Sequence, residues 1–110
     1  MSDPSAVAAE YFACMKRGDK GVLALFHDDA VLIGLGDEKS GRAAIDDFYL
    51  GVIERAGPSP TLLGPMLAEG NRVAAEVEIA LPGGTRIHAL DLFVIEDGRI
   101  RSLTYFIANH

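Results

Sequence analysis

The sequence has few of the features that would fix a function class at once. Of its 110 residues only Cys14 is a cysteine, so neither a disulfide framework nor a cysteine zinc site is expected. A lone thiol fits a reducing compartment, and we expect the protein in the cytoplasm. No segment approaches the length of a membrane-spanning helix, and the Met-Ser-Asp-Pro start lacks the basic flank and apolar stretch of a secretory signal.

Positive charge is also scarce and scattered. The ten Lys and Arg residues form no continuous run, and the formal net charge is −6, so we expect neither nucleic acid nor an anionic membrane as a partner. The sequence has no His, Asp and Glu cluster with metal-ligand spacing, no glycine-rich phosphate loop and no nucleophile elbow. We therefore expect no metal and no cofactor.

The sequence does have enough apolar residues for a core. Hydrophobic residues make up 49% of the chain, which excludes disorder, and 110 residues correspond to a single domain spanning 1–110. A domain this small buries a limited share of its surface, so a homodimer is expected.

Apolar periodicity predicts helices in the first half. Apolar residues recur at three- and four-residue steps over 4–17, which indicates an amphipathic helix ending at Gly18. Asp19 is the expected N-cap of a short second helix closed by residues 27–29, before a strand over 30–35. Ser40 is the expected N-cap of a third helix reaching Arg55.

The second half has the patterns of strands. Segments 61–67, 71–81, 85–96 and 99–108 are expected strands, and Asp97-Gly98 is a strong signal for a tight hairpin turn. Helices followed by an antiparallel meander predict an α+β fold, in which three N-terminal helices pack on one side of a curved antiparallel sheet.

Asp91 is the most informative residue of the sequence. It lies within the apolar segment 88–95, which we expect to be covered on both sides, and alternation puts it on the face of Ile87, Ala89 and Phe93. No cation shares that face, so the pKa of its carboxyl should be raised. Two alternatives remain open: a functional acid in an apolar pocket, or a structural aspartate bonded to a neighbouring loop. His88 has the opposite parity and cannot pair with Asp91.

Three segments carry a family resemblance that covers nearly the whole chain. Phe26-His-Asp-Asp-Ala30, Ser40-Gly-Arg-Ala-Ala-Ile-Asp-Asp-Phe-Tyr49 and Ala89-Leu-Asp91 with Asp97-Gly-Arg-Ile100 resemble the nuclear-transport-factor-like (SnoaL-like) superfamily, and within it the ketosteroid isomerases. The resemblance implies a cone-shaped fold. That fold serves isomerases, cyclases, dehydratases and noncatalytic modules, so it does not settle the activity.

The resemblance implies roles for particular residues. Tyr11 matches the oxyanion-hole tyrosine of the isomerases, Tyr49 a second tyrosine that supports it, and Asp91 an aspartic acid kept protonated in an apolar site. The family's general base has no counterpart, because the two possible alignments place Leu32 or Gly34 there.

Together these features predict a pocket for a small hydrophobic molecule. If the protein is an enzyme, the expected chemistry is keto–enol isomerisation or polyketide-cyclase-type aldol chemistry on a hydrophobic carbonyl compound, with Tyr11 and Asp91 as the catalytic pair. The alternative is a noncatalytic ligand-binding or dimerisation module of the same fold. The expected lining of the pocket, besides that pair, is Cys14, Tyr49, Val77, Ile79, Phe93, Leu103 and Ile107.

Overall fold

The computed structural model describes residues 3–34, 37–55 and 57–108, and its first element is the predicted amphipathic helix. Helix α1 spans Pro4–Arg17. Asp3 caps it by accepting a hydrogen bond from the backbone N–H of Ser5, and Gly18 ends it in the left-handed conformation at φ 67°. Both ends of the helix that carries Tyr11 are therefore fixed locally by the sequence.

The next elements differ in their bounds from the sequence prediction. The second helix is the 3₁₀ helix η1, Lys20–Leu25, and strand β1 already starts at Phe26 and runs to Ile33. Phe26 is fully buried and pairs with Ile100, while the His27 ring donates to the Glu96 carbonyl at 2.6 Å. Residues 26–29 thus extend the strand and do not close the helix, because the sheet supplies their partners.

Strand β2, Lys39–Ser40, precedes helix α2, Arg42–Arg55. Ser40 pairs with Val31 in the sheet, so the helix starts two residues later than its expected cap. Arg42 fixes this start, because its guanidinium donates to the carbonyls of Leu23 at 2.7 Å and Phe26 at 2.6 Å. It thereby ties the helix carrying Tyr49 to the junction of η1 and β1.

The remaining strands are β3, Ser59–Leu62; β4, Leu67–Glu69; β5, Arg72–Ala80; β6, Arg86–Glu96; and β7, Arg99–Ile107. The expected strand 61–67 is split in two around Gly64-Pro65, since proline cannot donate to a ladder, and both parts pair with β5. The predicted turn has positive φ at both Asp97 and Gly98, 53° and 75°.

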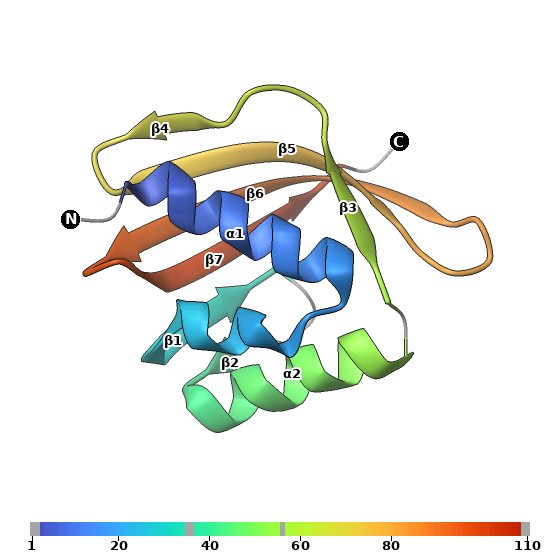
Figure 1. Ribbon diagram of the computed structural model, residues 1–110, viewed down its shortest axis with the longest axis horizontal. Helices are drawn as coiled ribbons and strands as arrows, with labels where there is room; N and C mark the ends of the chain where they lie inside the picture. Colours follow the sequence, from blue (N-terminus) through green and yellow to red (C-terminus); the bar gives the residue numbers. More distant parts are fainter. Residues whose placement is uncertain (1–2, 35–36, 56, 109–110) are drawn as a thin grey trace.

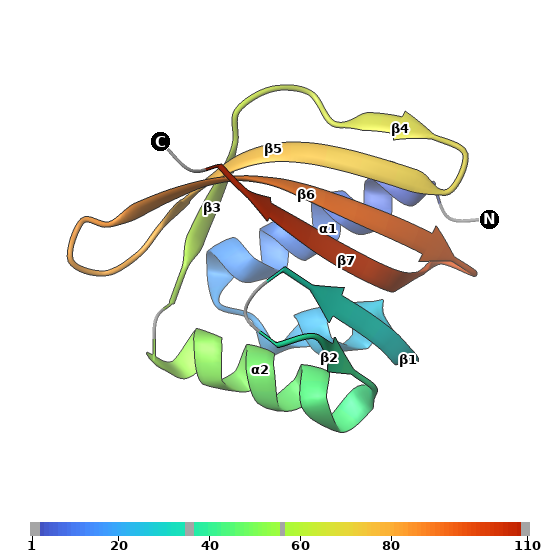
Figure 2. The ribbon, with the colours of Figure 1, turned by 180° about the vertical axis from the view of Figure 1, so that it is seen from behind.

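The strands form one mixed sheet in the order β2-β1-β7-β6-β5-β3, with β4 also paired to β5. All pairings are antiparallel except β1 with β7, which are parallel. Figure 1 shows α1 in front of β5, β6 and β7 with α2 below it, and Figure 2 shows the curled sheet from behind. The predicted α+β fold, with helices packed on a curved sheet, is confirmed.

The two faces of the sheet differ in their cover. On β6, Ala89, Asp91 and Phe93 are buried as alternation predicts, whereas Leu90 on the other face is 41% exposed. The expectation that this strand is covered on both sides is therefore wrong for the single chain. The outer face carries a hollow that includes Leu67, Leu90 and Phe106, all of them exposed. No helix in the described part of the chain is long and apolar enough to cross a membrane.

Candidate functional site

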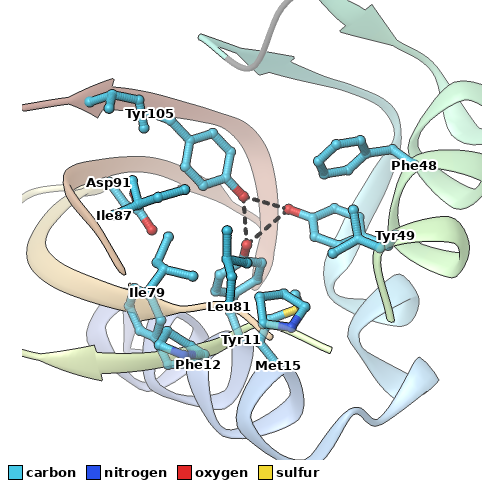
Figure 3. A pocket seen from close by; sticks show the side chains of 14 residues that line it. Tyr11, Phe12, Met15, Phe48, Tyr49, Ile79, Leu81, Ile87, Asp91 and Tyr105 are labelled. Atoms are coloured by element: carbon cyan, nitrogen blue, oxygen red, sulfur yellow. Dashed lines mark hydrogen bonds between the residues drawn. The ribbon is translucent and has the colours of Figure 1, made fainter. Parts of the chain in front are cut away.

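A cavity of about 200 Å³ lies between the helices and the inner face of the sheet (Figure 3). Its walls are apolar apart from three tyrosines and one aspartate. Tyr11, Tyr49, Ile79, Asp91 and Ile107, all singled out in the sequence, are among the lining residues. The others are Phe12, Met15, Phe48, Val52, Pro58, Pro60, Leu81, Ile87 and Tyr105.

Four residues expected in the lining lie elsewhere in the core. Cys14 is buried on the side of α1 that carries Glu10, whose Oε1 is 3.4 Å from its Sγ. Phe93 is fully buried beneath Tyr11 and Phe12, with ring centroids 5.3 and 5.5 Å away. Val77 and Leu103 are likewise fully buried and absent from the cavity wall. These four side chains are therefore part of the core outside the cavity wall.

Tyr105 is the functional candidate that the sequence reasoning missed. It lies on β7 directly opposite Asp91 on β6, and its side chain is buried. Strand alternation puts Tyr105 on the same face as Leu103 and Ile107, which the sequence analysis had already placed in the pocket. The same alternation could have identified Tyr105 as an inward-facing residue.

The three tyrosines come from different elements and meet at one point of the cavity (Figure 3). The Tyr11 hydroxyl oxygen lies 3.0 Å from that of Tyr49 and 2.6 Å from that of Tyr105. The Tyr49 and Tyr105 oxygens are 2.8 Å apart. We call this group the tyrosine cluster. Its hydroxyls satisfy one another, which removes the cost of burying three polar groups without water.

Burial shifts the ionisation of the cluster strongly. The pKa of Tyr11 is raised, first by burial and then by the negative charge of Asp91 nearby. The pKa values of Tyr49 and Tyr105 are raised well above 10, again mainly by burial. The cluster therefore holds its protons at neutral pH, because an ionised tyrosine would be poorly solvated in this cavity.

Asp91 faces the cluster without bonding to it. Its side chain is 1% exposed, and its Oδ1 has no hydrogen-bond partner among the described residues. Burial in apolar surroundings raises the pKa of the carboxyl from 3.8 to about 7. The sequence left two interpretations open, a functional acid in a pocket and a structural aspartate bonded to a loop. The structure shows no loop partner for Oδ1, and it places the carboxyl at a cavity.

Neither position that matches the base of the isomerases holds an acid, and Gly34 has no room for one. Leu32 is buried in the core and does not line the cavity. Gly34 has φ 102°, and a Cβ placed there would collide with the carbonyl oxygen of Tyr105. Asp91 is also the sole carboxylate among the residues that line the cavity. Any proton transfer by a carboxylate inside the cavity must therefore involve Asp91.

Comparison with known proteins places this geometry in a wider context. The family model described as the SnoaL-like domain matches residues 8–103. No match was found among curated proteins. A candidate ketosteroid isomerase from Kribbella flavida superposes with a TM-score of 0.84 at 22% identity, covering 97% of this chain and 78% of that one.

Two further solved structures have the same fold. A candidate polyketide cyclase from Sinorhizobium meliloti has a TM-score of 0.81 at 22% identity, with 91% of this chain and 93% of that chain covered. A computationally designed binder of 17-OHP has a TM-score of 0.84 at 17% identity, with 96% and 94% covered. At these identities the likeness shows the fold.

The buried carboxyl should make stability depend on pH in a defined direction. Well below pH 3.8 Asp91 is neutral in both the folded and the unfolded chain. Between pH 4 and 7 it ionises in the unfolded chain first, so the folded state loses stability as the pH rises, by up to roughly 4 kcal/mol for a shift from 3.8 to about 7.

Asp91→Asn removes this ionisation and keeps the volume. We expect urea unfolding to show that the variant gains stability relative to the unmodified protein between pH 4 and pH 8. Asp47→Asn, which makes the same change at an exposed carboxylate on α2, is the matched control and should show no such trend. A stability difference for Asp91→Asn that is equal at both pH values would contradict the raised pKa.

Proposed function

Since the chain belongs to the SnoaL-like domain family, we propose that it is a cofactor-independent enzyme that moves a proton on a small hydrophobic carbonyl compound. The observation that carries the proposal is the Asp91 carboxyl, buried at the cavity without a hydrogen-bond partner for its Oδ1. Most buried polar atoms are bonded, so a carboxylate oxygen that no described residue bonds, placed at a cavity, is available to a ligand.

The pKa of Asp91 suits proton transfer at neutral pH. A general acid–base group works best when its pKa lies near the working pH, because both protonation states are then populated. Burial raises the pKa of Asp91 to about 7, which meets this condition. In this proposal Asp91 itself supplies the proton transfer for which the family's usual base, at Leu32 or Gly34, is missing.

The proposed second catalytic residue is Tyr11. Its hydroxyl belongs to the tyrosine cluster, which lies across the cavity from Asp91 (Figure 3). A ligand oxygen beside the cluster would leave the neighbouring carbon within reach of Asp91. The cavity volume of about 200 Å³ is below the roughly 300–1,000 Å³ of pockets for drug-sized ligands, which favours a compound of one or two rings.

Deuterium exchange on a two-ring ketone tests this proposal. We expect the protein to accelerate exchange of the α-protons of 2-tetralone in D₂O, followed by proton NMR, by about a hundredfold or more over buffer. Asp91→Asn should abolish the acceleration, because an amide cannot accept the proton. Asp47→Asn changes an exposed carboxylate outside the cavity and should exchange like the unmodified protein.

A 5-ene-3-ketosteroid is the contrasting substrate. It exceeds the size that the cavity of about 200 Å³ favours. We expect its turnover to be undetectable or at least about a hundredfold below that of a competent isomerase. Rapid steroid isomerisation would contradict the proposed size limit, and ketone exchange that survives Asp91→Asn would contradict the proposed role of Asp91.

The second candidate is a noncatalytic ligand-binding module, and the observation that favours it is the missing base. Gly34 cannot be replaced by an acid without a collision, and Leu32 does not line the cavity, so the chain is not one substitution away from the usual site of the isomerases. Binding of 2-tetralone without any exchange would favour this candidate over the enzyme.

We propose in addition that the protein is a homodimer that covers the outer face of its sheet. Leu67, Leu90 and Phe106 are 70%, 41% and 52% exposed around one hollow, which is much apolar surface for so small a chain. Light scattering at micromolar concentration should give twice the chain mass, and Leu90→Glu should shift it toward the monomer. A monomeric mass for the unmodified protein would contradict the dimer.

A further inference from the structure

All three tyrosines of the chain belong to the tyrosine cluster, and their protons can be counted. The oxygens of Tyr11, Tyr49 and Tyr105 lie 3.0, 2.6 and 2.8 Å apart, so each pair is within hydrogen-bond distance (Figure 3). A phenolic hydroxyl carries one proton that it can donate and also accepts through its lone pairs. Three hydrogen bonds therefore consume all three protons that the cluster has.

We propose that Tyr105 closes the cluster into a ring, and that the cavity consequently selects a ligand that brings its own hydroxyl proton, such as a phenol or an enol, over one that has a carbonyl alone. This inference rests on the proposed function, because it concerns the ligand of the same cavity. In a closed ring each hydroxyl donates to one neighbour and accepts from the other. A ligand that leaves the ring intact therefore finds acceptor capacity and no donor, and a carbonyl oxygen receives a proton from Tyr11 only when one ring bond breaks.

The two ligand types differ by one hydrogen bond. A ligand hydroxyl can donate to a free lone pair of the ring, which adds a bond and breaks none. A carbonyl needs a proton from the ring, so one ring bond breaks and two hydroxyl oxygens are left facing each other through lone pairs. One neutral hydrogen bond corresponds to about a 3- to 10-fold difference in affinity.

Tyr105 is the specificity-determining residue in this scheme. Without its hydroxyl, Tyr11 and Tyr49 share one contact and still have two protons, so one proton becomes available to a ligand carbonyl. Asp91 does not enter this count, because its Oδ1 has no hydrogen-bond partner among the described residues and the three hydroxyls bond to one another. Removing a hydroxyl should therefore improve carbonyl binding. If the hydroxyls instead formed an open chain whose last proton reached the ligand, removing one of them would weaken carbonyl binding.

Calorimetry with three probes that share the naphthalene ring system tests the inference. 2-Naphthol has a donor and an acceptor, 2-naphthaldehyde has an acceptor only, and naphthalene has neither. We expect the unmodified protein to bind the naphthol about 3- to 10-fold more tightly than the aldehyde. In Tyr105→Phe the aldehyde should gain affinity by a similar factor, so the preference disappears, while naphthalene affinity stays unchanged.

Tyr49→Phe is the second variant, because deletion of any one hydroxyl opens the ring and should have the same effect on the aldehyde. It also keeps the test decisive if Tyr105→Phe does not fold, which a thermal melt would show. An aldehyde that binds as tightly as the naphthol, or loses affinity in both variants, would overturn the closed ring. If none of the three probes binds, the small-molecule pocket itself is overturned, whereas binding without ketone exchange contradicts only the catalysis.

Discussion

The burial of four polar side chains in an otherwise apolar cavity is the constraint on which the site depends. Three of them, the hydroxyls of Tyr11, Tyr49 and Tyr105, satisfy one another at 2.6–3.0 Å. The fourth, Asp91, has an oxygen with no partner among the described residues. Burial disfavours the charged form of this carboxyl, and its pKa rises to about 7. The proposed chemistry follows from the unpartnered carboxyl, and the proposed ligand preference follows from the three hydroxyls that bond to one another.

The scaffold holds these groups on separate elements that are fixed independently. Tyr11 lies on a helix capped at Asp3 and Gly18, and Tyr49 on a helix that Arg42 ties to two backbone carbonyls. Asp91 and Tyr105 face each other across neighbouring antiparallel strands. Rigid placement of this kind lets a cavity discriminate ligands by a single hydrogen bond, because the groups need little reorganisation when a ligand binds.

The sequence predicted the fold and the exceptional character of Asp91 more completely than it predicted the site. Periodicity located α1 and the inward face of β6, since each depends on local pattern. It missed the start of β1 at Phe26, because a parallel partner distant in sequence decides that boundary. The role of Tyr105 was missed for a related reason: parity shows which way a strand residue points, but the meeting of three hydroxyls depends on how helices and sheet pack together.

The protonation of Asp91 links the fold to the proposed function, and carbon-13 NMR measures it directly. With aspartate labelled at the side-chain carboxyl carbon, and Asp91→Asn used to assign the resonance, the account predicts a titration midpoint near 7 for Asp91 in the folded protein. A midpoint near 4 for Asp91 would mean that the cavity solvates or pairs the carboxylate, and would contradict the central claim.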